Sequence, residues 1–409
     1  MTCADALARR LNTAPGAPIA VGFSGGGDSL AALIVTKAWA DRVGRPVLAL
    51  CVDHGLQPQS ADWTALAGET AARLGAGFQA LRWEGEKPSR GLPAAARAAR
   101  HRLIAEAARE AGARAVVLGH TADDGIEAEV MRGWGARMGW LREWSPSPVW
   151  PEGRGLFVLR PLLGVRRAAL RDWLAARGGR WIDDPANADP RQLRARARIV
   201  IGGGGDTTAT PDDDGAADLA HETMGGPDAS LILPRAVLRA APGGAVRRFL
   251  AAALSSVGGG AGPPRSERLA ALQARLVDTL PVHATLCGAR LVADDQTVTI
   301  TREPGRGRAP AVDLPAHQPI VWDGRFELCA AEPGLSVRTL GGLAARLPTA
   351  ERAALRCLPP EARPVLPAIV LPDGGVTSPV LAQGPATARA LAHDRVRAAC
   401  GAISKEPAT

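Results

Sequence analysis

The sequence predicts an α/β fold for roughly its first two hundred residues: a doubly wound parallel sheet with helices on both faces. Short apolar runs alternate there with stretches of helical length, which is typical of repeated β-α units. Glycine-rich and acidic segments follow several of the apolar runs, as expected where ligands bind beyond the carboxyl ends of parallel strands. The 409 residues exceed one typical domain, so a smaller, mostly helical or mixed C-terminal region is expected as well.

The expected strands and helices alternate along the chain. Four apolar runs are interpreted as buried parallel strands, at residues 18–23, 46–52, 78–83 and 115–118. Helices are expected after them, at residues 30–43, 61–74, 93–110 and about 124–138. The loops that follow the strands are therefore the candidate site.

A change in composition divides the chain. Residues 201–230 contain six aspartates, Glu222 and no Lys or Arg, a net charge of −7, and include four consecutive glycines. We expect a catalytic domain over residues 1–200, an acidic Gly/Asp-rich linker or loop over 201–230, and a C-terminal region over 231–409. In that region, residues 234–254 and 265–280 are expected to be helical, and 291–301 and 320–328 to be strands.

The chain is basic. Its net charge is +8 with a pI near 9.9, and all but three of its 49 cationic residues are arginine. Such a chain suits a polyanionic partner, although abundant Ala, Gly, Pro and Arg with no Tyr also indicates compositional bias. Six scattered cysteines without a C-x-x-C pair are typical of a reduced, cytoplasmic protein. Neither a membrane span nor a cleaved signal is expected.

The first expected strand runs into a glycine-rich loop that opens a helix, Ser24-Gly25-Gly26-Gly27-Asp28-Ser29. Glycines let backbone N–H groups converge at a helix N-terminus, where anions bind. The serine hydroxyls are donors for phosphate oxygens, and Asp28 is a candidate ligand for Mg²⁺ held against them. The pattern is neither a Walker A motif nor a dinucleotide fingerprint. A capped turn without a ligand is the alternative.

Two further loops carry polar residues. Asp53 and His54 follow the second expected strand. Gly119 and His120 follow the fourth, and Asp124 and Glu127 come next, three residues apart on one helix face. Two carboxylates on one face would hold a cationic amine or a metal. Favourable interaction with the helix dipole is the alternative for the acids, and an ordinary loop histidine is the alternative for His54.

Arginines gather at two places. Arg97 and Arg100 lie one turn apart on an expected helix, and four arginines follow an Asn/Asp-rich turn at 184–189: Arg191, Arg194, Arg196 and Arg198. Acidic residues do not balance the second group, so it predicts contact with nucleic acid or phosphate. A solvated charged face is the alternative for both.

These motifs resemble known enzymes. The loop Ser24–Ser29 resembles the pyrophosphate loop (PP-loop) of the N-type ATP pyrophosphatases. Further motifs follow it in the same order as in the tRNA(Ile)-lysidine synthases: Gly119-His120, Asp123-Asp124 with Glu127, Arg160-Pro161-Leu162-Leu163, and Asp184-Pro185-Ala186-Asn187-x-Asp189 running into arginines. The resemblance covers about residues 18–200 well and the C-terminal half weakly. The chain departs from the family's usual residues at four positions: His101, Thr121, Gly125 and Ala195.

The resemblance implies a fold, a reaction and a site. A PP-loop ATP-pyrophosphatase domain would ligate free L-lysine to C2 of the wobble cytidine of tRNA(Ile) with a CAU anticodon, through an adenylated intermediate. ATP would lie against Ser24–Ser29, Asp53, His54, Gly119 and His120, with Mg²⁺ at Asp28 and lysine at Asp124 and Glu127. Arg97, Arg100 and Arg194 would act with these residues in catalysis, Arg191, Arg194, Arg196 and Arg198 would contact tRNA, and residues 231–409 would bind it too. The resemblance permits a homodimer.

Other functions are consistent with some of these motifs. Another PP-loop enzyme would adenylate a small molecule or a different tRNA base. A tRNA thiolase commonly uses paired cysteines, and this chain has no C-x-x-C. A nucleotide-sensing module would leave Asp124 and Glu127 without a role.

Overall fold

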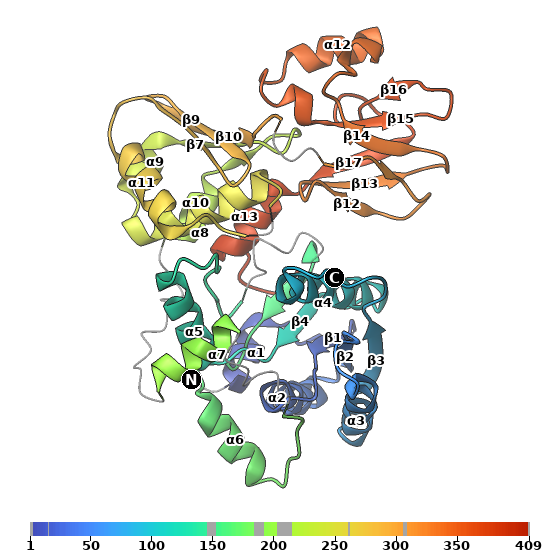
Figure 1. The fold of residues 1–409 in the computed structure, drawn as a ribbon, viewed down its shortest axis with the longest axis vertical. Coiled ribbons are helices and arrows are strands. Elements are labelled where there is room, and N and C mark those ends of the chain that lie inside the picture. Colours follow the sequence, from blue (N-terminus) through green and yellow to red (C-terminus); the bar gives the residue numbers. More distant parts are fainter. Residues whose placement is uncertain are drawn as a thin grey trace. The chain divides into compact units, whose positions relative to one another are not determined.

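The computed structural model describes residues 3–14, 16–144, 153–183, 192–202, 215–260, 262–305 and 309–407. The chain forms two compact units, residues 1–212 together with 403–409, and residues 213–402 (Figure 1). The return of the C-terminal tail to the first unit was not predicted from the sequence. The Asn/Asp-rich turn at 184–189 and Arg191 lie outside the described residues.

The first unit is built on the predicted parallel sheet. Its strand order is β3-β2-β1-β4-β5, and every neighbouring pair is parallel. The strands are β1 (Ile19–Gly22), β2 (Val47–Asp53), β3 (Gly77–Arg82), β4 (Ala115–Leu118) and β5 (Phe157–Leu159). The first four confirm the expected strands, and β5 was not anticipated. The order reverses between β1 and β4, so the loops after these two strands border the crevice in which doubly wound sheets bind ligands.

Helices cover both faces of this sheet. They are α1 (Cys3–Arg10), α2 (Gly27–Val43), α3 (Ser60–Arg73), α4 (Leu92–Glu110), α5 (Ala122–Gly133), α6 (Arg167–Ala175) and α7 (Leu193–Ile201). Figure 1 shows α4 on one side of the sheet and α2 and α3 on the other. The helix expected at 124–138 ends earlier, at Gly133, because Gly135 takes a φ of +82° that a helix does not allow.

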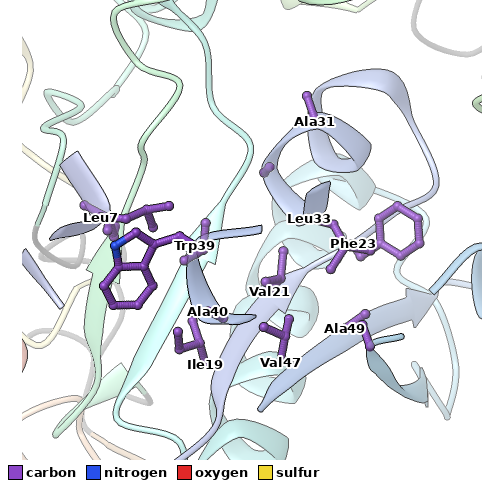
Figure 2. Packing of buried hydrophobic residues seen from close by; sticks show 14 of the residues in the cluster. Leu7, Ile19, Val21, Phe23, Ala31, Leu33, Trp39, Ala40, Val47 and Ala49 are labelled. Carbon is purple, nitrogen blue, oxygen red and sulfur yellow. The ribbon is translucent and has the colours of Figure 1, made fainter. Parts of the chain in front are cut away.

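Alternation along β1 builds a core on each face. Ile19 and Val21 pack with residues of α2 and α3 in one cluster, whereas Ala20 packs with residues of α4 in another. Figure 2 shows part of the first cluster, with Val21, Leu33 and Phe23 beside the central strand. These side chains are almost fully buried, and each contributes about 1.5–3 kcal/mol to folding. The core therefore holds the strand whose end carries the glycine-rich loop.

The second unit consists mainly of antiparallel sheets with helices. Its sheets have the orders β6-β7-β10-β9-β8, β11-β14-β15-β16 and β12-β13-β17. The strands of the first sheet are β6 (Met224–Gly225), β7 (Leu231–Pro234), β8 (Val282–Leu286), β9 (Ala289–Ala293) and β10 (Thr297–Arg302). The others are β11 (Val312–Asp313), β12 (Ile320–Trp322), β13 (Phe326–Ala330), β14 (Ser336–Thr339), β15 (Pro367–Val370), β16 (Val376–Thr377) and β17 (Ala386–Ala390). The helices are α8 (Ala216–His221), α9 (Arg235–Ala240), α10 (Gly243–Val257), α11 (Ser266–Val277), α12 (Thr349–Arg356) and α13 (Ala392–Cys400).

Several expectations for this half were wrong in detail. Residues 234–254 do not form one helix, because Pro242 separates α9 from α10. Residues 291–301 form the hairpin of β9 and β10, and 320–328 contain the turn between β12 and β13, where Asp323 and Gly324 both have positive φ. The acidic segment 201–230 is not a linker throughout, since α8 and β6 lie within it. Among the described residues, no helix combines the length and apolarity needed to cross a bilayer.

Candidate active site

The glycine-rich loop folds back on itself at the start of α2. Ser29 Oγ donates to the carbonyl of Gly26 at 2.9 Å and accepts from the N–H of Ser24 at 3.2 Å. Gly25 has a φ of +78°, and a Cβ there would lie 2.4 Å from Ile182. The N–H of Ile182 in turn donates to the carbonyl of Gly25 at 3.0 Å. The loop is therefore held in shape at a helix N-terminus, the arrangement that binds phosphate groups.

Gly119 brings the β4 loop against this helix. A Cβ on Gly119 would lie 2.7 Å from the carbonyl oxygen of Asp28 and 2.9 Å from the Cα of Ser29. Both are backbone atoms that cannot give way, so only glycine allows the approach. The close packing places the first turn of α2 beside the first turn of α5, which carries the acidic pair.

Arg167 joins the three predicted carboxylates. Its Nε donates to Asp28 Oδ2 at 2.9 Å, Nη1 to Glu127 Oε1 at 3.0 Å, and Nη2 to Asp124 Oδ2 at 3.3 Å. Arg167 is the first residue of α6, and its backbone N–H donates to Asp123 Oδ2 at 2.7 Å. Each nitrogen of one planar fork thus contacts a different carboxylate, which fixes their spacing. Arg167 was not among the site residues predicted from the sequence.

Two arginines of α7 also contact the acidic pair. Arg198 Nε donates to Glu127 Oε1 at 2.7 Å, and Arg194 Nη1 donates to Asp124 Oδ1 at 3.3 Å. Arg194 Nε also lies 3.5 Å from Glu127 Oε2, and the side chain of Glu127 is only 1% exposed. Arg194 and Arg198 were predicted to contact tRNA. In this structure they hold the carboxylates, so the acidic pair already binds cationic groups.

Arg196 lies apart from its neighbours on α7. Its guanidinium carbon is 5.6 Å from the ring centroid of Trp134. Positions four apart share a helix face, whereas a residue between them points elsewhere. The predicted arginine strip is therefore divided between two surfaces.

Charge and burial shift the pKa values of this cluster in opposite directions. Burial raises the pKa of Asp28, and Arg167 offsets only part of that effect. Burial also opposes the ionisation of Asp124, but the charges of Arg194 and Arg167 and the N–H of Thr121 hold its pKa below the usual value. Burial would lower the pKa of Arg167, yet contact with Asp124, Asp28 and Glu127 raises it. Asp124 is thus ionised and Arg167 charged at neutral pH.

The four departures from the family's usual residues fit without steric conflict. Thr121 is fully buried, and its N–H and Oγ1 each donate to Asp124 Oδ2 at 2.9 Å, forming a capping box. Asp124 therefore also caps its helix, and its place in the first turn allows the favourable dipole interaction named as the alternative for the acidic pair. A Cβ on Gly125 would meet open space, and Ala195 is buried. His101 is half-buried, and burial together with Arg97 lowers its pKa to about 2.

Basic groups collect beside this cluster. Burial and the charge of Arg100 lower the pKa of Arg97 to about 9, and burial with the charge of Arg194 lowers the pKa of Arg100. Burial and Arg160 lower the pKa of His120 well below its usual value, so its imidazole is neutral at pH 7. Within the described residues, neither Arg97 nor Arg100 forms an ion pair with a carboxylate. This arrangement suits an incoming anion.

The loop after β2 places the His54 imidazole at right angles to the Trp83 indole. His54 packs edge-on against Trp83, with ring centroids 5.9 Å apart, and His54 Nδ1 is buried with no hydrogen-bond partner among the described residues. Asp53 Oδ1 accepts from the N–H of Gly55 at 2.8 Å. The ammonium of Lys87 lies 4.3 Å from the Trp83 ring centroid. Aromatic rings of this kind stack on nucleobases, although in this structure the Lys87 ammonium already lies over the indole ring.

The parallel sheet, its strand order and the glycine-rich loop define a PP-loop domain. The PP-loop domain family matches residues 2–202. The chain is also 47% identical over 421 aligned positions to the tRNA(Ile)-lysidine synthase of Caulobacter vibrioides, covering 99% of this chain and 98% of that protein. The enzyme of the same name from Mesorhizobium japonicum is 35% identical over 79% of this chain and 75% of its own length. The chain belongs to the tRNA(Ile)-lysidine synthase family, whose members are tRNA-modifying ligases.

Proposed function

We propose that this protein ligates lysine to C2 of the wobble cytidine of tRNA(Ile) with a CAU anticodon, releasing AMP and pyrophosphate. This proposal rests mainly on the contacts of Arg167, which joins Asp28 of the PP-loop to Asp124 and Glu127. An ATP-binding loop and a cation-binding acidic pair thus share one site. Membership of the lysidine synthase family supplies the substrate class.

The first half-reaction uses ATP. Cytidine O2 attacks the α-phosphorus, an O–P bond forms, the bond between the α- and β-phosphates breaks, and pyrophosphate leaves. The backbone N–H groups at the start of α2 and the hydroxyls of Ser24 and Ser29 would bind the phosphates and stabilise the charge that develops on them. Arg97 and Arg100, which lack a carboxylate partner among the described residues, would bind another phosphate of ATP or of the RNA.

Asp28 suits the Mg²⁺ that ATP carries. Arg167 occupies Oδ2 of this carboxylate, which leaves Oδ1 as a possible ligand. Mg²⁺ typically takes one or two carboxylates together with phosphate oxygens and water, and the described residues contain no larger cluster of ligands. When bound there, Mg²⁺ would neutralise charge on the leaving pyrophosphate.

The second half-reaction uses the amine of lysine. The amine attacks C2, a C–N bond forms, the C2–O bond to the adenylate breaks, and AMP leaves while the amine loses its protons. Asp124 and Glu127 already accept hydrogen bonds from guanidinium groups, so an ammonium group matches their chemistry. The lowered pKa of Asp124 suits binding of the cation more than acceptance of its proton.

The decisive experiment supplies ATP, Mg²⁺, labelled lysine and a tRNA(Ile) transcript with a CAU anticodon. Label should enter the RNA, with one AMP and one pyrophosphate formed for each lysine. RNA that stays unlabelled while a known lysidine synthase labels it would disprove the proposal. Pyrophosphate release that is independent of tRNA would favour the alternative, a PP-loop enzyme that adenylates a small molecule.

Isosteric variants should separate the two half-reactions. Asp28→Asn removes the proposed metal ligand, so tRNA-dependent pyrophosphate formation should fall at least about a hundredfold.

Glu127→Gln keeps the shape of the side chain and weakens the cation site, so the KM for lysine should rise about tenfold or more while adenylation of the RNA persists. Pyrophosphate release and lysine incorporation are measured side by side. Equal losses of both activities in Glu127→Gln would contradict these assignments.

A further inference from the structure

A second surface lies at the other end of α5. We call it the Trp134 surface, and it consists of Arg132, Trp134, Trp140, Arg196, Ile199 and Val200. Trp134 directly follows the last residue of α5 and is 43% exposed. Ile199 and Val200, at the end of α7, are 68% and 67% exposed. Large apolar side chains are therefore presented to solvent next to arginines.

Two cation–aromatic pairs belong to this surface. The guanidinium carbon of Arg196 lies 5.6 Å from the Trp134 ring centroid, and that of Arg132 lies 5.3 Å from the Trp140 ring centroid. Among the described residues, Glu129 pairs with Arg132 at 3.9 Å, and the Glu129 side chain is 74% exposed. The Arg132 side chain is only 13% exposed, and its Nη1 donates to the carbonyl of Gly139 at 3.2 Å. The exposed positive charge of this surface therefore comes chiefly from Arg196.

The local sequence explains why Trp134 faces solvent. Gly133 and Gly135 flank it, and the positive φ of Gly135 turns the chain away from the helix axis. α7 packs against α5 with Arg194 and Arg198 on the acidic pair, and that packing leaves Arg196 above Trp134. One helix thus carries arginines for the active site and one for the Trp134 surface.

We propose that the Trp134 surface binds unpaired bases of the RNA substrate near the nucleotide that is modified. Planar indole faces stack on bases of any sequence, and adjacent guanidinium groups bind the phosphates between them. An acidic peptide would satisfy the arginines but supplies no planar groups for the indoles. α5 has 12 residues, so roughly 18 Å separates its two ends, a span that a single-stranded loop can bridge.

This inference rests on the proposed function for the identity of the RNA, but its test does not depend on lysine transfer. The dissociation constant of a stem-loop RNA with an unpaired CAU loop is measured for the wild type, Trp134→Leu, Trp134→Phe and Arg196→Met. Trp134→Leu should weaken binding roughly tenfold or more, because one stacking contact is lost. Trp134→Phe should recover most of that loss. The KM values for ATP and lysine should stay unchanged.

Salt dependence separates stacking from phosphate contact. Arg196→Met should reduce the slope of log Kd against log salt by about one, whereas Trp134→Leu should leave the slope unchanged. Arg177→Met is the matched control, since Arg177 also lies over a tryptophan, Trp173, at 4.3 Å. It should bind RNA like the wild type. Thermal unfolding checks that each variant is folded. If Trp134→Leu does not fold, the affinity of Trp134→Phe is used in its place.

Three results would overturn the inference. The first is a folded Trp134→Leu variant that binds the stem-loop with wild-type affinity. If Trp134→Leu does not fold, the corresponding result is a folded Trp134→Phe variant that loses as much affinity as Arg196→Met. Another is an equal loss of affinity for a fully paired duplex of the same length, because paired bases cannot stack on an indole. The third is competition by polyglutamate as strong as by the RNA loop. Failure of the proposed function is distinct, since wild-type protein would then bind the stem-loop without transferring lysine.

Discussion

Replacing Arg167 with methionine should reduce kcat/KM for lysine by at least about tenfold, which corresponds to about 1.4 kcal/mol. The guanidinium contacts Asp28, Asp124 and Glu127 at once, and its side chain is only 18% exposed. Without it, three carboxylates from two helices repel one another, and Asp124 and Glu127 lose the group that sets their spacing. A rise in the KM for lysine is expected, because the pair no longer presents a fixed cation site.

The pH profile gives a second measure of the same change. Arg167 offsets part of the burial that raises the pKa of Asp28 and helps to hold the pKa of Asp124 below its usual value, so it favours the charged form of both carboxylates. Removing the cation raises those pKa values, and lysine incorporation should then be lost at a higher pH than in the wild type. Arg167→Lys keeps the positive charge but lacks the planar guanidinium that contacts three carboxylates. Compared with Arg167→Met, it should therefore recover the wild-type pH profile more fully than the wild-type KM for lysine.

Steady-state kinetics over a range of pH would test both expectations, with Arg177→Met as the control on the exposed end of the same segment. A purely structural role for Arg167 would lower kcat in proportion to the folded fraction and leave the KM for lysine and the pH profile unchanged. That outcome would show that Arg167 does not help to bind lysine.

The sequence predicted the framework of this site well. Four apolar runs of strand length lie in the parallel sheet, and the glycine-rich loop lies where the first of them ends. Buried parallel strands have near-continuous apolar sequences, and their spacing by helices leaves little choice of topology. Asp124 and Glu127 were predicted to share a helix face because three-residue spacing at the start of a helix is a local pattern, and both contact Arg167.

Arg167 could not be found in the same way. It is one of two adjacent arginines in an arginine-rich chain, and its partners lie 139, 43 and 40 residues away. No local pattern encodes such a contact, which depends on how α6 begins relative to α2 and α5. The arginines of α7 show the same limit. Their cationic character was evident, but only packing against α5 decides that Arg194 and Arg198 meet carboxylates while Arg196 meets Trp134.

The C-terminal half was predicted less well for physical reasons. Short antiparallel strands and tight turns leave weak periodic signals, so the hairpin of β9 and β10 was read as one strand. Pro242 was overlooked as a helix break within residues 234–254. The return of the C-terminal tail to the first unit depends on a contact between residues 361 positions apart, which composition cannot reveal.

Breaking that contact should destabilise the first unit by about 3–5 kcal/mol, the usual cost of leaving one partner of a buried ion pair alone. Arg45 Nη1 and Nη2 donate to the two carboxylate oxygens of Glu406 at 2.7 and 2.9 Å, and both side chains are only 2% exposed. Glu406 Oε2 also accepts from the N–H of Asn12 at 2.9 Å, and Arg45 also donates to the carbonyl of Ala17. Glu406→Gln leaves the Arg45 charge buried among these groups without its counter-ion.

Urea unfolding of Glu406→Gln, Arg45→Met and the double variant would measure this pair. The double variant should lose less stability than the two single variants together, because it leaves neither charge unpaired. Truncation after Ala402 should cost as much as Glu406→Gln or more, since it removes the whole tail. Glu106→Gln is the control, because its pair with Arg102 is exposed and separated by one helical turn, and it should cost about 0.3–0.5 kcal/mol. Similar small losses for Glu406→Gln would mean that the tail does not stabilise the first unit, even though it is packed against it.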